Sequence, residues 1–227
     1  MSIGACNIIS SFVLPKIVTH FSRVHPLIKV NLYEGNIDSL NEKLHNGTLD
    51  LILDNYPIDE SVYFTVPLFQ ESLYVAMSQA LCKKIENKYL VNSMTNKQLL
   101  SESPDEKSNK AVPFSIFHNT PFIILRKGND TRIRYDQLCV DFNIHPPIIL
   151  EVDQLSTAYN ICSNHFGVTL VSDTLIKNSS SAKSLKYFQI DSKVTERTVF
   201  FHYPKHHYLR LAVKAFLKEA ISIYAMI

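Results

Sequence analysis

The chain has 227 residues, which exceeds the usual single domain but is short for two independent domains, so it fits two interlocked lobes of roughly 100 residues each. Hydrophobic residues make up 46% and charged residues 19% of the chain, which excludes general disorder and predicts a folded, soluble protein. The formal net charge is only +2 and the basic residues are scattered, so the composition is not that of a dedicated nucleic-acid-binding domain.

Targeting and membrane segments are not suggested by the sequence. No stretch approaches the run of about 18 apolar residues that a membrane span needs, and the start, "MSIGACNIIS", lacks the basic residues and long apolar core of a signal peptide. We therefore expect a cytoplasmic protein, although a mature exported protein would also lack its signal. The four cysteines are widely spaced without a Cys-x-x-Cys pair, which predicts reduced thiols and not a zinc or redox motif.

The first 54 residues alternate between strand and helix patterns. Apolar residues recur every four positions from Ile9 to Phe21 and predict the buried stripe of one helix. Asn36 is a good cap for the next helix, and Gly47 supplies a left-handed stop. The predicted order is strand, helix, strand, helix, strand, over residues 2–6, 9–24, 28–33, 36–47 and 49–54. Such alternation specifies a parallel sheet covered on both faces.

The rest of the chain repeats this alternation. Ile133, Leu138 and Phe142 are expected on the inner side of one helix, and Asp153 is expected to cap another. The predicted strands cover residues 68–77, 121–125, 146–152, 167–171 and 197–203, and the predicted helices cover residues 131–142, 153–164 and about 206–224. We expect this last helix to pack on the first lobe. The predicted fold class is α/β, with two Rossmann-like lobes.

Residues 101–110, "SESPDEKSNK", contain no apolar side chain, so they cannot bury surface against either lobe. They predict a mobile surface loop, which is an insertion and not a domain boundary.

Motifs for catalysis are not found. The five glycines form no Gly-x-Gly-x-x-Gly, no phosphate-binding P-loop and no Gly-x-Ser-x-Gly nucleophile elbow, so we predict no enzyme, no catalytic residue and no cofactor. His202, His206 and His207 could in principle share a metal ion. Pro204 interrupts their spacing, however, and no cysteine or carboxylate lies beside them, so we predict no metal site.

Glycines and polar residues fall at the carboxyl ends of predicted strands. Gly4, Gly35 and Gly128 lie there, and Asn36 and Asp153 begin the helices that follow. Ligands of open α/β sheets bind at such ends, where helix N-termini offer unpaired N–H groups. The alternative is that these residues only cap helices. The candidate ligand-binding residues are Cys6, Asn7, Ile8, Ile9, Asn36, Ile37, Arg126, Lys127, Gly128, Arg132, Asp153 and Gln154.

Residues 3–53 resemble the start of LysR-type effector-binding domains. The shared features are a strand ending in glycine at Gly4, an "FxxxHP" helix end at Phe21 to Pro26, "EGN" from Glu34, and Gly47 with Asp50 before the third strand. The resemblance continues more weakly through "PLFQESLYVAM", "PFIIL", "EVDQLSTAYNI" and "FGVTLVSD", so it covers nearly the whole chain.

The resemblance implies a type 2 periplasmic-binding-protein fold, in which two crossover strands join the lobes and an effector is held in the cleft. The crossings map to about residues 70–74 and 197–201, and the domain boundaries give lobe I as 1–71 plus 202–227 and lobe II as 72–201. In the full-length family a winged helix-turn-helix precedes the first strand. This chain starts at that strand, so we expect it to lack the helix-turn-helix. We expect contact with DNA only in the full-length protein, through that missing segment.

The implied function is effector sensing that controls DNA binding and transcription by a LysR-type factor. Family members pair lobe I of one subunit with lobe II of the other, so a homodimer is expected, and a tetramer when full-length. Because Arg126, Lys127 and Arg132 suit a carboxylate and Ile8 suits an apolar portion, we expect a carboxylic acid or an amino acid as effector.

Four positions depart from the family pattern. Cys6 and Ile8 stand where small hydroxyl residues are common, and His165 and Ser172 stand where Gly and Pro are common, so effector identity does not transfer. The alternative function is an extracytoplasmic solute-binding protein of a transporter. An enzyme on the same scaffold would need a converging acid and base, and the sequence shows no such pair.

Overall fold

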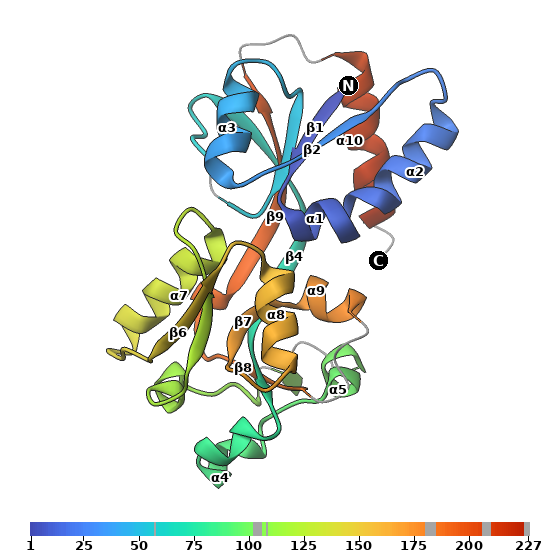
Figure 1. The fold of residues 1–227 in the computed structure, drawn as a ribbon. Helices are drawn as coiled ribbons and strands as arrows, with labels where there is room; N and C mark the ends of the chain where they lie inside the picture. The colour runs from blue at the N-terminus through green and yellow to red at the C-terminus, as the bar shows by residue number, and fades with distance from the viewer. Residues whose placement is uncertain (57, 102–105, 108, 180–184, 206–209, 225–227) are drawn as a thin grey trace. The chain divides into compact units, whose positions relative to one another are not determined.

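A computed structural model describes residues 1–56, 58–101, 106–107, 109–179, 185–205 and 210–224. The chain forms two compact units. Unit 1 comprises residues 1–70 and 197–227, and unit 2 comprises residues 71–196 (Figure 1). Residues 197–201, which the sequence-based boundaries place in lobe II, therefore lie in unit 1. The reason is that this segment hydrogen-bonds to a strand of unit 1.

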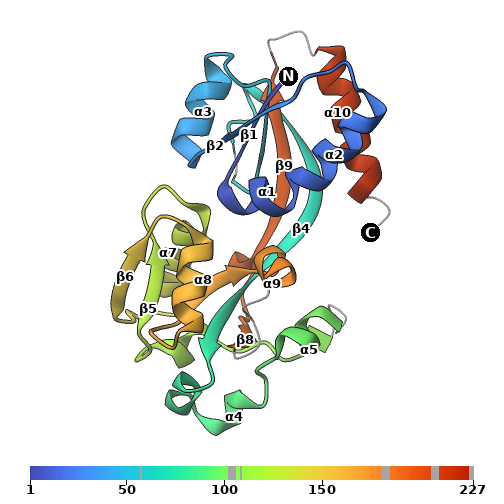
Figure 2. The ribbon, with the colours of Figure 1, turned by 45° about the vertical axis from the view of Figure 1, so that its right-hand side comes forward.

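Unit 1 is a mixed sheet with helices on both faces. Its strands are β1 (Ser2–Ala5), β2 (Asn31–Glu34), β3 (Leu51–Asp54), the first part of β4 (Tyr63–Ser78) and β9 (Glu196–Pro204), and its helices are α1 (Asn7–Phe12), α2 (Leu14–Val24), α3 (Ile37–His45) and α10 (Leu211–Tyr224). The sheet order is β2-β1-β3-β9-β4, with β1 parallel to β2 and β3, and β9 antiparallel to β3. Figure 2 shows α3 on one side of this sheet and α2 with α10 on the other.

The core of unit 1 lies mainly between the sheet and the pair α2 and α10. Phe21 of α2 contacts Phe216 of α10 edge to face, with ring centroids 5.1 Å apart, and both side chains are fully buried. The predicted packing of the last helix on lobe I is therefore observed for the described part of that helix, whereas its expected start at His206 lies outside the described residues. On the other face, Leu40 and Leu44 pack α3 against the sheet.

Two details of unit 1 differ from the sequence prediction. The single helix predicted over residues 9–24 is two helices, which meet at Val13. Pro15 explains the break, because it lacks the N–H that would bond to the carbonyl of Ser11. The strand predicted at 28–33 lies at 31–34, because the alternation of Ile28 and Val30 reports packing on the core and not strand pairing.

Three glycine and cap predictions can be checked in unit 1. Gly47 has φ +77, the left-handed conformation expected at the end of α3. Asn36 caps α3, since its side-chain oxygen accepts from the Ser39 N–H at 3.0 Å. Gly4, predicted at the carboxyl end of the first strand, lies inside β1 one residue before its end, where a Cβ would lie 2.8 Å from a Leu40 methyl and 2.6 Å from a Leu49 methyl.

Unit 2 contains a second parallel pair of strands. Its strands are the rest of β4, β5 (Phe122–Leu125), β6 (Ile148–Val152), β7 (Thr169–Ser172) and β8 (Leu185–Gln189). Its main helices are α7 (Asp130–Asp141), α8 (Leu155–Ser163) and α9 (Asp173–Asn178), and its short helices are η1 (Leu81–Lys84), α4 (Asn87–Leu90), α5 (Asn96–Ser101), η2 (Phe114–Phe117) and η4 (Lys193–Thr195). β5 runs parallel to β6, whereas β7 and β8 both pair antiparallel with β4. Figures 1 and 2 show α7 and α8 on opposite sides of the β5–β6 pair.

Aromatic side chains form much of the core of unit 2. Phe114, Phe117 and Phe122 are fully buried, and Phe114 packs on both of the others with centroids 5.7 to 5.9 Å apart. Tyr135 from α7 packs on Phe122 at 5.1 Å. Contacts of this kind add to the stabilisation that burial of the rings provides.

Three expectations for unit 2 fare differently. Leu138 is buried on the inner side of α7 as expected, but Ile133 is 46% exposed, because α7 turns Tyr135 inward in its place. Asp153 was expected to cap α8, but the cap position is Gln154, whose side chain makes no capping bond. The predicted loop at 101–110 lies largely outside the described residues.

Candidate functional site

The first candidate surface is the strand-end edge of unit 1, formed by Cys6, Asn7, Glu34, Asn36 and Ile37. Because β1 and β2 are parallel, their carboxyl ends lie at the same edge of the sheet. There the Asn7 amide donates a hydrogen bond of 2.9 Å from Nδ2 to Glu34 Oε1, which joins the start of α1 to the end of β2. Asn36 is exposed and uses its side-chain oxygen as a helix cap, so its amide N–H groups face solvent. This edge offers amide and carboxylate groups to a ligand.

Apolar candidates in unit 1 differ in accessibility. Ile9 is 1% exposed and belongs to the hydrophobic core, so it holds α1 in place. Ile8 is also buried, at 6%. Ile37 and Cys6 are half-buried and therefore accessible in part. Ile37 is thus the better apolar contact for a ligand.

A buried polar network at the end of β3 was missed by the sequence analysis. Asp54, Asn55 and Arg197 are only 5–7% exposed. The Asn55 N–H donates to Asp54 Oδ1 at 2.7 Å. With its amide oriented so that the oxygen faces Arg197, Asn55 accepts from Nη2 at 3.0 Å and Nε at 3.1 Å. The network ties β9 to the end of β3. Asp54 and Asn55 stand out in the sequence as a polar pair at the end of a buried strand, but no local pattern pairs them with the arginine of "ERTV".

The second candidate surface is the strand-end edge of unit 2, formed by Arg126, Lys127, Gly128, Asp153 and Gln154. β5 and β6 are parallel, so the loops that follow them lie at one edge. Arg126 Nε lies 3.6 Å from Asp153 Oδ1, and the two side chains are 62% and 71% exposed. Gly128 has φ +89, which a residue without a Cβ adopts readily, and it turns the chain toward α7. Arg126 and Lys127 are therefore exposed cations at this edge.

Arg132 has a different setting from Arg126. Its side chain is 10% exposed, and its Nε donates to both carboxylate oxygens of Asp136 at 2.9 and 3.0 Å. Its Nη1 donates to the Leu125 carbonyl at 3.0 Å and to Glu151 Oε1 at 3.3 Å. The guanidinium is thus engaged by two carboxylates and a carbonyl. It fixes α7 to the ends of β5 and β6, which leaves it poorly placed to bind a further carboxylate.

Burial keeps several titratable groups neutral. It lowers the pKa of His202 on β9 to about 4, so this histidine is neutral at pH 7. It raises the pKa of the Cys162 thiol to about 12 and also raises the pKa of Cys82 and Cys139. These three cysteines are therefore thiols at pH 7, the form that is a poor nucleophile.

The residues that the structure describes form neither a metal-binding cluster nor a membrane-spanning helix. No group of three or more His, Cys, Asp or Glu side chains there is arranged to hold a metal ion. Of the three histidines considered above, His202 is buried in β9, and His206 and His207 lie outside the described part of the chain. No described helix is both long enough and apolar enough to cross a membrane.

Comparisons with known proteins extend over almost the whole chain. The HTH-type transcriptional regulator YcgK of Bacillus subtilis is 24% identical over 96% of this chain and 65% of its own length. The hydrogen peroxide-inducible genes activator of Haemophilus influenzae is 22% identical over 89% of this chain and 60% of its own length. The chain therefore spans less than two thirds of these two relatives.

Solved structures share the fold. The regulatory domain of CcmR from Synechocystis, described in complex with 2-PG, has a TM-score of 0.79 at 16% identity, over 99% of this chain and 96% of that domain. The effector-binding domain of BenM, described with its effector benzoate, has a TM-score of 0.73 at 18% identity, over 100% and 92%. These likenesses confirm the predicted α/β fold class, with two Rossmann-like lobes of the type 2 periplasmic-binding-protein kind. The profile described as the LysR substrate binding domain matches residues 1–222, and this chain belongs to that family.

Proposed function

We propose that this chain is the effector-sensing domain of a LysR-type transcription regulator. The observation that carries the proposal is the pair of exposed cations, Arg126 and Lys127, at the carboxyl ends of parallel strands, in a chain that belongs to the LysR substrate binding domain family. DNA binding resides in a helix-turn-helix segment of the whole protein, as the names of its relatives suggest. The domain is cytoplasmic and non-enzymatic, and it controls transcription by changing state when the effector binds.

The candidate effector-binding residues of each unit lie at its own strand-end edge. In unit 1 they are Cys6, Asn7, Ile8, Asn36 and Ile37, and in unit 2 they are Arg126, Lys127, Gly128, Asp153 and Gln154. Ile9 and Arg132 act indirectly, because the first is part of the core and the second is held by Asp136 and Glu151.

The effector is a carboxylic acid or an amino acid. Arg126 presents a planar fork that suits a carboxylate, and its partner Asp153 is highly exposed, so exchanging it for a ligand carboxylate costs little. An amino acid would also satisfy Glu34, whose second carboxylate oxygen can accept from an ammonium group. Ile37 supplies apolar contact. Shikimate and benzoate, with which two solved relatives are described, are carboxylates and fit this class.

The domain is a homodimer, and the full-length protein is a tetramer. Exposed apolar side chains support this proposal: Val24 and Leu32 in unit 1 are 49% and 43% exposed, and Val140 and Ile148 in unit 2 are 73% and 47% exposed. Such residues favour burial against a second copy. Light scattering at tens of micromolar should give the mass of a dimer, and a monomer would contradict this part of the proposal.

The effector site is tested by a thermal-shift screen of metabolite acids and their neutral amides, followed by calorimetry on the best acid. Arg126→Gln should weaken its binding by about tenfold, since a charge-assisted hydrogen bond is worth about 1.5 kcal/mol. Lys97→Gln, an exposed lysine of unit 2 on α5, is the matched control and should bind normally. If only neutral compounds stabilise the domain, or if Arg126→Gln binds the acid unchanged, the anionic effector is wrong.

The regulatory role needs the full-length protein. Its affinity for an operator duplex should change when the acid is added, and the Arg126→Gln variant should require more acid for the same change. The isolated chain should show no sequence-dependent shift of duplex DNA, because its basic residues form no stripe. Full-length protein that binds the acid without any effect on DNA binding or transcription would contradict the sensor and favour transport.

A further inference from the structure

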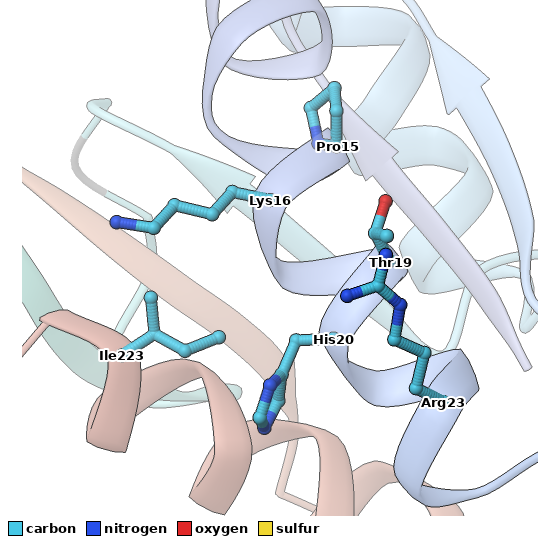
Figure 3. Close-up of a pocket in the computed structure, with 6 residues that line it drawn as sticks. All are labelled: Pro15, Lys16, Thr19, His20, Arg23 and Ile223. Atoms are coloured by element: carbon cyan, nitrogen blue, oxygen red, sulfur yellow. The ribbon is translucent and has the colours of Figure 1, made fainter.

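A groove between α2 and α10 lies in unit 1, apart from the strand-end edges. Its volume is about 490 Å³, which falls in the range of small-molecule sites. It is lined by Pro15, Lys16, Thr19, His20, Arg23 and Ile223 (Figure 3). The effector proposal does not use these residues.

The groove is cationic because α2 contributes only basic and neutral side chains to it. Lys16, His20 and Arg23 follow one another at spacings of four and three residues, which places them on one face of the helix. Figure 3 shows Lys16 and His20 extending from α2 toward α10, while Arg23 folds back along α2 toward Thr19. No residue of α2 is acidic. The electrostatic field in the groove therefore favours an anion.

The nearest carboxylate is already engaged by histidines. Glu219 on α10 lies 3.0 Å from His20 Nε2 through Oε2 and 4.0 Å from His25 Nε2 through Oε1. Lys16 Nζ lies 5.8 Å from the ring centre of Tyr224, a distance at which a cation–π contact is weak. The side chain of Arg23 forms no hydrogen bond and no ion pair with any residue that the structure describes. Its guanidinium is therefore available to a ligand from outside the chain.

The floor of the groove is partly apolar. Pro15 at the start of α2 and Ile223 near the end of α10 line it together with the basic side chains. An inorganic ion would fill only a small part of about 490 Å³ and would leave these two residues uncovered. An organic acid with an apolar body would use both kinds of contact.

We propose that the α2–α10 groove is a second ligand site of this chain and binds a small organic acid. The carboxylate binds Arg23 beside Thr19, Lys16 adds positive charge on the side of α10, and the apolar body covers Pro15 and Ile223. The pair His20 and Glu219 keeps α10 beside α2 and thereby shapes the site. A ligand in the groove holds α10 against α2 and stabilises unit 1 by mass action.

The test uses naphthalene-2-carboxylate as the probe and naphthalene-2-carboxamide as its neutral control, titrated into the ¹⁵N-labelled chain at its natural oligomeric state. We expect the acid to shift the amide signals of Lys16, Thr19, Arg23 and Ile223, and the amide to leave them unchanged. Arg23→Gln and Lys16→Gln should each weaken binding by about fivefold, since the site is exposed. Lys29→Gln removes an exposed lysine of the same unit outside the groove and should bind the acid normally.

Several results would overturn the proposal. They are unchanged affinity in both groove variants, equal binding of the neutral amide, equal binding of inorganic phosphate, and tighter binding of a hexaglutamate peptide, which would make the groove a protein-docking surface. Val24, the α2 residue assigned to the proposed dimer contact, is not among the residues that line the groove. Arg126→Gln separates this site from the effector site, because it should leave the shifts in the groove intact.

Discussion

The strand-end edges of the two units carry different chemical groups. The edge of unit 1 presents an amide bonded to a carboxylate, Asn7 and Glu34, whereas the edge of unit 2 presents the exposed cations Arg126 and Lys127. Buried charges occur in both units but serve a different purpose, since Arg197 in unit 1 and Arg132 in unit 2 tie secondary structure elements together. Exposure and existing partners, more than residue type, therefore decide which groups can bind a ligand.

The largest losses of stability are expected from substitutions in the two separate cores. Phe122→Ala in unit 2 and Phe21→Ala in unit 1 each remove a fully buried ring and should each lower the free energy of unfolding by about 3–5 kcal/mol. Because the rings belong to different clusters, amide hydrogen exchange should rise first in the unit that carries the change. Equal loss of protection in both units for either variant would show that the two cores unfold as one.

The buried histidine of unit 1 should make that unit sensitive to acid. Burial lowers the pKa of His202 to about 4, below its value of about 6.5 in an unfolded chain. The unfolded state therefore binds a proton first, so stability is lost as the pH falls from about 6.5 to about 4 and is fully present above that window. The expected loss is about 3 kcal/mol.

His202→Gln removes this titration and keeps a polar group 3.2 Å from Thr65 Oγ1, where the histidine Nδ1 now lies. Urea unfolding at pH 7, 5.5 and 4.5 should give a flatter pH dependence for the variant than for the parent. His45→Gln, an exposed histidine of α3, is the control and should keep the parent's slope. Parallel pH profiles for His202→Gln and the parent would contradict the assignment.

The two arginines of unit 2 should separate stability from binding. Arg132→Gln leaves the Asp136 and Glu151 carboxylates without their partner and should cost about 2 kcal/mol, less than a fully buried pair because both carboxylates are about half exposed. Arg126→Gln should change the free energy of unfolding by less than about 0.5 kcal/mol, while it weakens the binding of the acid. Denaturant midpoints and calorimetry on the same two proteins check this. An Arg132→Gln variant as stable as the parent would show that the guanidinium is free.

Much of the architecture could be predicted because periodicity reports burial. The alternation of strands and helices, the Asn36 cap and the Gly47 stop all follow from local rules, and the structure contains them. The same signal misled where burial occurs without pairing, as at Ile28 and Val30, and where α7 turns Tyr135 and not Ile133 to the core. Periodicity cannot tell which of two apolar residues on a helix packs against another element of the core.

The candidate site was less predictable for an electrostatic reason. Sequence position placed Arg126 and Arg132 together after β5. Asp136 follows Arg132 by one turn of α7, but only tertiary structure brings Glu151 of β6 to the same guanidinium. The buried set Asp54, Asn55 and Arg197 joins residues more than 140 positions apart, so no local pattern reveals it. The partners that a cation meets in the folded chain, whether near or far in sequence, decide whether it remains available to a ligand.

A small effect on stability is expected at Asn36, which is both a helix cap and a candidate effector contact. Asn36→Ala removes the bond to the Ser39 N–H and should cost about 1 kcal/mol, whereas Asp153→Ala in unit 2 should cost much less because its side chain does not cap α8. Asn36→Asp keeps the cap, since a carboxylate at this position also accepts from the helix N–H groups. It should therefore retain the parent's denaturant midpoint.

If the effector is an acid that contacts this edge, Asn36→Asp should still weaken its binding, because the new charge repels the carboxylate. Calorimetry and urea unfolding on the three variants separate the two roles, and an Asn36→Asp variant that binds the acid as well as the parent would remove Asn36 from the effector site while leaving its capping role intact.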